Sequence, residues 1–218
     1  MALPSSGAIS LNEIHVEAGG SSGSQVSIND TDVRDIKEIS SGAASSFNNF
    51  YGAKAPFTFT GTVGADNQDL PGNDYNAARN FRYRGFSKSA TFAGGSSFGT
   101  LSPTTNSDYV NNTEIIEFDT NGDNPGSSAS SGGCEFQLGV DNVSGSANNI
   151  NTDASFKKVD IGGTVFNRSD AAYSNGGPDG VDTYWVWSYT TTIPANQTDA
   201  MSPFGAAGTS YTGKLRGQ

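Results

Sequence analysis

Sulfur and imidazole are scarce in this sequence. A single cysteine, Cys134, cannot form an internal disulfide, which excludes the small secreted scaffolds that disulfides hold together. A single histidine, His15, leaves no partner set for Ser-His-Asp or Cys-His catalysis. One His and one Cys also cannot supply the three or four nitrogen and sulfur ligands of a zinc site. We therefore expect a protein that is not an enzyme and that holds no metal or cofactor.

Positive charge and long apolar runs are scarce as well. Only 12 Lys and Arg stand against 22 Asp and Glu, for a formal net charge of −10. No basic face can then neutralise many phosphates, which argues against nucleic acid as a partner. No apolar stretch reaches the roughly 18 residues of a membrane span, and the first residues lack the pattern of a signal peptide. We expect a chain that folds in a cytosol and is not membrane-embedded.

Glycine and aromatic residues are abundant instead. Gly contributes 28 of the 218 residues and Phe, Trp and Tyr 11%, a balance that indicates many turns between aromatic-bearing strands. After a linker at 54–56, residues 57–218 read as short strands between Gly, Asn, Asp and Ser clusters. The fold class we predict is mainly β, a β-sandwich-like domain. Strands are expected at 57–63, 80–88, 113–118, 134–140, 156–161, 164–167, 183–191 and 211–216.

Residues 1–53 differ in pattern from the rest of the chain, and this pattern predicts a small adaptor of short helices. Ser10 and Glu13 fit a capping box at the start of the first helix. A second helix begins near Asp30, and a third short piece ends at Gly52. Helices below about 12 residues are marginal alone, and a unit of about 50 residues buries little surface. We therefore expect this adaptor to need a partner surface and not to fold by itself.

The adaptor also repeats a phrase, and it resembles a known class of proteins. The motifs are "LPSSGAISLNEIHVEAGG", "VSINDTDVRDI" and "SGAASSFNNFYG". Ser-Ser-Gly-Ala occurs twice in this part of the chain, at residues 5–8 and 40–43. Over residues 3–52 they resemble the N-terminal segment of fibre and tail-associated structural proteins of marine, cyanophage-like tailed bacteriophages. More loosely, "YRGFSKSATFAGGSSFGTLSPTT", "TEIIEF", "FKKVDIGGTVFNRSDAAYS", "TYWVWSY" and "SPFGAAGTSYTGKLRG" resemble a β-domain that accompanies such segments.

The resemblance implies a virion structural protein in a tail fibre or tail-tip type of appendage that contributes to host attachment. Its partners would be other virion proteins, further copies of itself in a homotrimer, and a host surface glycan or envelope protein. Localisation in the virion, after folding in the host cytoplasm, is implied with it. The alternative is a capsid or neck decoration protein that stabilises the particle; a tail-associated depolymerase is the weaker alternative.

Two sets of residues are candidates for sites. The apolar members of the short helices are expected to anchor the adaptor to the virion: Leu11, Ile14, Val33, Ile36, Phe50 and Tyr51. The aromatic strand near 183–191 fills the sandwich core on one face, and its residues are also candidates for contact with a ligand or a neighbouring subunit: Tyr184, Trp185, Trp187 and Tyr189.

Two acidic patterns are candidates for chemical sites. "DTNGDN" at 119–124 begins like a calcium loop, but the later positions lack the required Gly and Glu, so a solvated turn is favoured. Whether the 119–133 segment binds calcium stays open. Glu114 and Glu117 lie three apart on a predicted strand and are therefore expected on opposite faces, which argues against a pair of facing carboxylates for glycoside hydrolysis.

Overall fold

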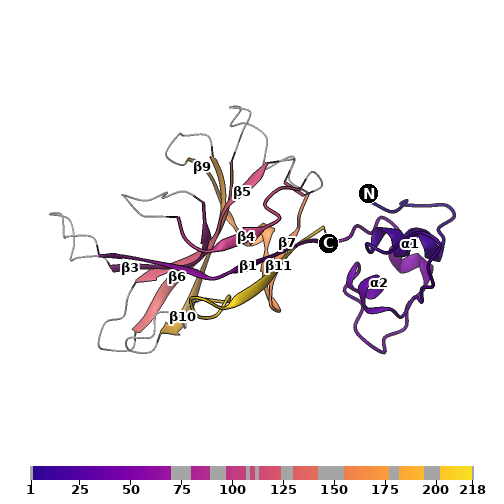
Figure 1. Cartoon of the computed structure of the whole chain (residues 1–218), viewed down its shortest axis with the longest axis horizontal. Helices are drawn as coiled ribbons and strands as arrows, with labels where there is room; N and C mark the ends of the chain where they lie inside the picture. The colour runs from indigo at the N-terminus through magenta and orange to yellow at the C-terminus, as the bar shows by residue number, and fades with distance from the viewer. Residues whose placement is uncertain are drawn as a thin grey trace.

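The protein is mainly β, as the sequence predicts. The computed structural model shows a small helical unit followed by two antiparallel sheets in a sandwich-like arrangement (Figure 1). The structure describes residues 2–69, 80–88, 97–106, 109–110, 113–123, 130–141, 155–176, 182–193 and 202–217. No helix in this described part is long and apolar enough to cross a membrane.

Every strand pairing in the two sheets is antiparallel. In spatial order, sheet A holds β4 (Thr100–Ser102), β1 (Phe57–Thr62), β11 (Ser210–Arg216), β7 (Lys158–Ile161) and β8 (Thr164–Asn167). Sheet B holds β2 (Gly64–Asp69), β3 (Asn80–Ser87), β5 (Glu114–Asp123), β6 (Ser130–Asp141), β10 (Asp182–Ile193) and β9 (Ala172–Gly176). A short 3-10 turn, η2 (Arg168–Asp170), carries the chain from the edge of sheet A to the edge of sheet B.

Aromatic rings fill the space between the sheets. Phe118 of β5 makes edge contacts with Phe59 of β1 at 4.8 Å between ring centroids and with Phe136 of β6 at 5.2 Å. It also lies 5.3 Å from Phe204 and 6.0 Å from Tyr211 of β11. Because these rings come from both sheets, Phe118 joins the two layers of the core.

Glycines opposite aromatic residues let the rings lie flat on the neighbouring strand. Phe59 faces Gly213 in the β1–β11 register, and a Cβ at Gly213 would lie 2.3 Å from the ring of Phe59. Tyr184 faces Gly139 in the β10–β6 register, where a Cβ would lie 2.6 Å from the ring. The glycine content of the strands therefore serves close packing as well as turns.

The helical unit closes on itself around its own small core. It contains α1 (Leu11–Glu17), α2 (Thr31–Asp35) and the 3-10 helix η1 (Phe47–Phe50). The backbone N–H of Leu3 donates to Ala53 at 2.8 Å and that of Gly52 donates to Pro4 at 2.9 Å, which joins the start of the unit to its end. The buried apolar side chains are Leu3, Ile14, Val33, Ile36, Phe50 and Ala53.

A capped helix start follows each copy of the Ser-Ser-Gly-Ala phrase. The backbone N–H of Ser10 donates to the Glu13 carboxylate at 2.7 Å, as the capping box predicts. The backbone N–H of Ser46 donates in the same way to the Asn49 side chain at 2.8 Å. Each copy is therefore followed by a short helix that a serine caps, α1 after Ser10 and η1 after Ser46.

Residues at equal distances from the two capping serines have similar environments. Four positions on, Ile14 and Phe50 are both fully buried in the core of the unit. One position on, Leu11 is partly exposed and Phe47 is 41% exposed. The repetition thus places two apolar residues inside the unit and two at its surface.

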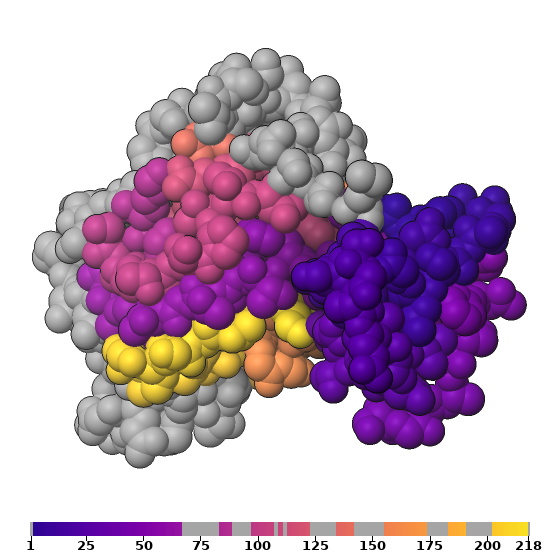
Figure 2. Space-filling model, turned by 45° about the vertical axis from the view of Figure 1, so that its right-hand side comes forward, coloured from indigo at the N-terminus to yellow at the C-terminus, as the bar shows by residue number. Residues whose placement is uncertain are grey.

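The helical unit lies at one end of the sandwich, next to the C-terminal strand β11 (Figures 1 and 2). Its buried residues form a cluster separate from that of the sandwich. The linker is held from both sides: the Ala55 N–H donates to Glu17 at 2.9 Å, and the Ala55 carbonyl accepts from the Tyr109 hydroxyl at 2.6 Å. Lys54 lies over the Tyr109 ring, 4.4 Å from its centroid.

Candidate functional site

Four of the six residues predicted to anchor the protein form the interior of the helical unit. Ile14, Val33 and Phe50 are fully buried and Ile36 is 1% exposed. Leu11 and Tyr51 are partly exposed, and the Tyr51 hydroxyl donates to the Gly7 carbonyl. The four buried side chains stabilise the unit itself and offer no surface to a partner while it is folded, because the chain closes around them.

Other apolar side chains of the unit are exposed. Val16 on α1 is 46% exposed, and Phe47 at the start of η1 is 41% exposed. Neither belongs to the predicted anchoring set, although Phe47 directly follows its capping serine, as Leu11 does. The repeated helix start is the sequence signal that could have identified Phe47, because the residue after each capping serine lies toward the surface.

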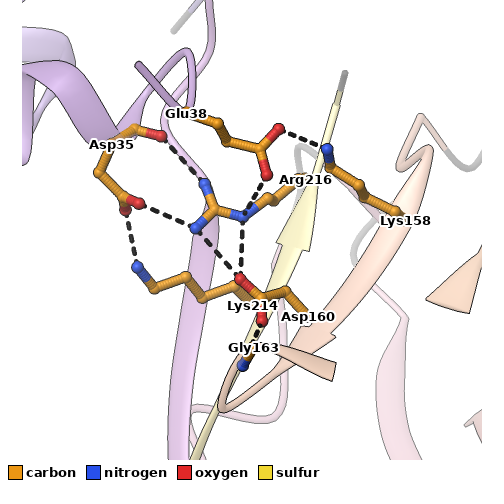
Figure 3. Close-up of polar contacts among 7 residues, drawn as sticks. All are labelled: Asp35, Glu38, Lys158, Asp160, Gly163, Lys214 and Arg216. Carbon is orange, nitrogen blue, oxygen red and sulfur yellow. Dashed lines mark hydrogen bonds and ion pairs between the residues drawn. The ribbon is translucent and has the colours of Figure 1, made fainter. Parts of the chain in front are cut away.

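The unit and the sandwich meet at a polar cluster, which we call the junction cluster: Asp35, Glu38, Lys158, Asp160, Lys214 and Arg216 (Figure 3). Arg216 lies at its centre, with a side chain that is 5% exposed. Its guanidinium donates to the Asp35 carboxylate at 2.8 Å and to the Asp35 carbonyl at 3.0 Å. It also reaches Asp160 at 3.4 Å and forms an ion pair with Glu38 at 3.6 Å.

Two lysines complete the junction cluster. Lys214, two residues before Arg216 on β11, donates to the other Asp35 oxygen at 2.7 Å. Lys158 at the start of β7 pairs with Glu38. Three carboxylates thus face three cations, so the cluster balances its own charge. Asp160 also accepts from the backbone N–H of Gly163 at 3.0 Å, which fixes its carboxylate.

A buried arginine on α2 shapes the segment that carries the acidic members. The Arg34 guanidinium donates to Asn29 at 2.9 Å and to the carbonyls of Ser40 and Ala43, the latter at 2.8 Å. These bonds tie the segment after α2 to the helix. Arg34 therefore holds the backbone that presents Asp35 and Glu38 to the sandwich.

Glu38 adopts a left-handed backbone conformation, with φ of 52°. Among the described residues it is the only non-glycine residue with positive φ. This conformation costs roughly 1–2 kcal/mol for a residue with a Cβ. It lies in the turn after α2, and it places the Glu38 carboxylate against Lys158 and Arg216. The ion pairs of the junction cluster offset the backbone strain.

Proximity to two cations controls the charge of Asp35. Partial burial acts to raise its pKa, but the hydrogen bonds from Lys214 and Arg216 outweigh burial and leave the pKa below the ordinary aspartate value. The pKa of Arg216 is raised, since its bonds to Asp35 outweigh the opposite effect of burial. Both groups are thus charged at neutral pH.

We predict that the junction cluster withstands mild acid. A lowered pKa in the folded state means that the stabilisation by Asp35 is present above the ordinary aspartate pKa and is lost only as pH falls through the lowered value. The radius of gyration from small-angle scattering should stay constant down to about pH 4 and rise below it. The Asp35→Asn variant should show the larger radius already at neutral pH. A wild-type transition centred above the ordinary aspartate pKa would contradict this.

The aromatic strand lies mainly inside the sandwich. Trp185 is 1% exposed, and its ring centroid lies 5.0 Å from that of Phe156. Trp187 is 3% exposed, and its ring centroid lies 5.1 Å from that of Phe136. The Trp187 indole donates to the Asn167 carbonyl at 2.6 Å. Both tryptophans fill the core, as the core interpretation of this strand predicts.

The two tyrosines of that strand are also largely covered. Tyr184 is 6% exposed and lies against Gly139 on the opposite face of sheet B. Tyr189 is partly buried, with its ring 6.0 Å from that of Phe166. Contact of this strand with a ligand or a neighbouring subunit therefore stays a prediction. The burial of its aromatic rings does not favour it.

The chemical candidates from the sequence are not assembled into a reaction centre. His15 is buried with Nε2 at 2.7 Å from the Ser24 hydroxyl, and Cys134 is fully buried. The Ser24 hydroxyl donates to the Ser21 carbonyl, so His15 Nε2 is the donor in that contact. Within the described ranges, no group of three or more His, Cys, Asp or Glu residues is placed to hold a metal ion.

Two expectations about the acidic patterns are wrong. Residues 119–123 form the end of β5 and not a solvated turn, because they pair with β3 on one side. Glu114 and Glu117 also do not lie on opposite faces: a bulge at 115–117 shifts the β5–β6 register, so that Glu114 faces Asp141 while Glu117 faces Gly139. Since Asp141 and Gly139 share a face of β6, Glu114 and Glu117 lie on the same face of the sheet.

Comparison with known proteins found no match to a family model, to a curated protein or to a solved structure.

Proposed function

We propose that the chain is a virion structural protein of a tailed bacteriophage, in a tail fibre or tail-tip type of appendage that contributes to host attachment. The observation that supports this best is the division of the molecule. A helical unit with its own core is fixed to one end of a sandwich through the junction cluster, and the sandwich extends away from it (Figure 1). The helical unit is the part that resembles phage tail segments.

In this proposal the helical unit joins the particle and the sandwich is displayed. Attachment uses the exposed apolar side chains of the unit, Phe47 and Val16, together with the partly exposed Leu11. Burying each such side chain against a partner is worth about 1.5–3 kcal/mol. In this proposal the two capped helices act alike, because each supplies one inner and one outer apolar residue.

The displayed sandwich is proposed to act without catalysis. Several copies, as a homotrimer or on neighbouring sites of the particle, add weak contacts to a host glycan or envelope protein through avidity. The negative charge of the chain keeps nucleic acid out of this set of partners. The protein is proposed to fold in the host cytoplasm and to reside in the virion.

We expect the double variant Val16→Asp/Phe47→Asp to lose its place in the particle. A carboxylate in an apolar contact is costly to desolvate, and two lost side chains should lower incorporation by about a hundredfold or more. Mass spectrometry of purified particles measures the copy number, and circular dichroism checks the fold.

The sandwich offers a matched control for this experiment. Val165 on β8 is 46% exposed, as Val16 is, and Tyr173 on β9 is 38% exposed. Val165→Asp/Tyr173→Asp therefore adds the same charge at equally exposed apolar sites. Wild-type incorporation of this control and loss of the first variant support attachment through the helical unit. The reverse pattern assigns attachment to the sandwich and refutes the proposal.

A decoration protein of the capsid or neck is the second candidate. The observation in its favour is that the longest helix in the described residues, α1, has seven residues, so the described chain builds no coiled-coil shaft to extend its reach. Copy number separates the two candidates. Hundreds of copies per particle would indicate decoration, whereas a handful would indicate the tail.

A further inference from the structure

The outer face of sheet B carries a row of acidic and amide side chains. On β5 the core face holds Phe118, which packs on Phe59 of the other sheet. Its immediate neighbours Glu117 and Asp119 therefore point to the opposite, outer face, because side chains alternate along a strand. The bulge at 115–117 adds Glu114 to the same face. Three carboxylates of one strand thus share the outer face.

Two of these carboxylates are buried on that face. Glu117 and Asp119 are each 3% exposed. The Ser87 hydroxyl donates to Glu117 at 3.4 Å, whereas Oδ1 of Asp119 is buried without a hydrogen-bond partner. The residues directly opposite Asp119 on the two neighbouring strands are Gly85 and Gln137, and neither carries a charge. A buried ionised carboxylate in such a place is costly.

Among the described side chains, the titratable groups placed on this face near Asp119 are acids or phenols. Their strand positions on this face are Asp66 on β2, Tyr83 on β3, Glu117 on β5 and Glu135 on β6. Burial, followed by the charge of Asp119, also raises the pKa of Tyr211 on β11. The described cations on the adjoining strands lie elsewhere: Arg84 faces Thr120, and Lys88 pairs with Glu114.

These surroundings raise the pKa of both Tyr83 and Asp119. Burial, followed by the charges of Asp119, Glu117, Asp66 and Glu135, raises the pKa of Tyr83 to about 12. Burial and then the charge of Glu117 raise the pKa of Asp119 well above its usual range. The outer face of sheet B is therefore a region where negative charge is disfavoured.

We propose that Asp119 and Glu117 share one bound proton inside the folded sandwich, and that this buried pair is a pH-sensitive element of the fold. The neutral carboxyl of Asp119 removes one of two adjacent buried charges. Loss of the proton leaves two like charges on neighbouring outward positions of β5, and this repulsion weakens the central strands of sheet B.

The direction of the pH effect follows from linkage. The unfolded chain releases the Asp119 proton near the ordinary aspartate pKa of 3.8, whereas the folded chain retains it to higher pH. Between these two values the folded state binds one more proton than the unfolded state, so stability falls as pH rises. The equilibrium constant for unfolding should rise by up to about tenfold per pH unit in this window.

The test compares the wild type with Asp119→Asn, which resembles the protonated carboxyl in shape and charge. Thermal melting from about pH 5 to about pH 9 should show a falling melting temperature for the wild type relative to Asp119→Asn. Glu114→Gln is the matched control, since Glu114 shares the strand and the face but is partly exposed and paired with Lys88. It should follow the wild type.

Two further measurements test directly whether Asp119 carries a proton in the folded protein. Infrared spectroscopy at neutral pH should show the carbonyl band of a protonated carboxylic acid in the wild type, lost in Asp119→Asn. Parallel pH profiles of the two proteins, or absence of the band, would overturn the proposal. A rise in melting temperature with added Ca²⁺, seen in the wild type and absent in Asp119→Asn, would overturn it as well, because it would mean that Asp119 is ionised and holds a cation.

Discussion

Replacing Phe118 by alanine is expected to lower the free energy of unfolding of the sandwich by about 3–5 kcal/mol. The side chain is fully buried and contacts rings from both sheets, so its removal leaves a cavity that neither layer can fill alone. A loss of this size is a large part of the stability of a typical domain. Urea unfolding followed by tryptophan fluorescence measures it, because Trp185 and Trp187 lie in the same core.

Tyr173→Ala is the control for this prediction. Tyr173 is 38% exposed on the edge strand β9, and its truncation should change stability by no more than about 0.5 kcal/mol. Equal effects of the two variants would contradict the packing described for the core.

Replacing Arg216 by methionine should release the helical unit from the sandwich. Methionine keeps much of the arginine stem but leaves Asp35, Glu38 and Asp160 with two lysines as their cations. Removing one partner of a buried ion pair costs about 3–5 kcal/mol, and the partial exposure of these carboxylates reduces this to about 2 kcal/mol here. The cores of the two parts are separate, so no continuous apolar interface compensates.

Limited proteolysis detects this release at the linker, residues 54–56. Cleavage there should become faster by about tenfold or more, since a loss of about 2 kcal/mol raises the opened population accordingly. Lys88→Met is the control: it removes the pair with Glu114, in which the Lys88 side chain is 53% exposed, and should leave the linker protected. Cleavage of Arg216→Met at the wild-type rate would show that the junction cluster does not hold the unit.

Much of the fold was predictable because local chemistry determines it. The capping box at Ser10 and the strand at 164–167 occur as predicted, since each depends on residues a few positions apart. The predicted strands at 57–63 and 211–216 pair with each other as β1 and β11. The pairing itself was not predictable, because it joins segments separated by most of the chain.

The parts of the fold that the sequence did not predict have physical causes. Asp119 to Asp123 have the composition of a turn, yet neighbours on β3 and β6 hold them as the end of β5. β4 has only three residues and β9 follows a 3-10 turn, so neither shows a clear alternation. The bulge at 115–117 reverses the parity on which the argument about Glu114 and Glu117 depended.

The candidate site was less predictable from the sequence than the fold. Ile14, Val33, Ile36 and Phe50 were identified as important apolar residues, but a pattern of helix spacing does not distinguish an interior from an attachment surface. Asp35 and Arg216, which form the junction cluster, lie far apart in the sequence and carry no local signal. The pairing of β11 beside β7 brings Arg216 next to Lys158 and Asp160, and Asp35 reaches it from the end of α2 in the helical unit.

The position of the chain in purified phage particles tests the central proposal most directly. Cryo-electron microscopy of the particles, with mass spectrometry to confirm the chain, locates both parts of the molecule. We expect the helical unit against the tail, with Phe47 and Val16 in the contact, and the sandwich pointing outward. Absence of the chain from the particles, or a sandwich packed against the particle with the helical unit free in solvent, would contradict the proposed function.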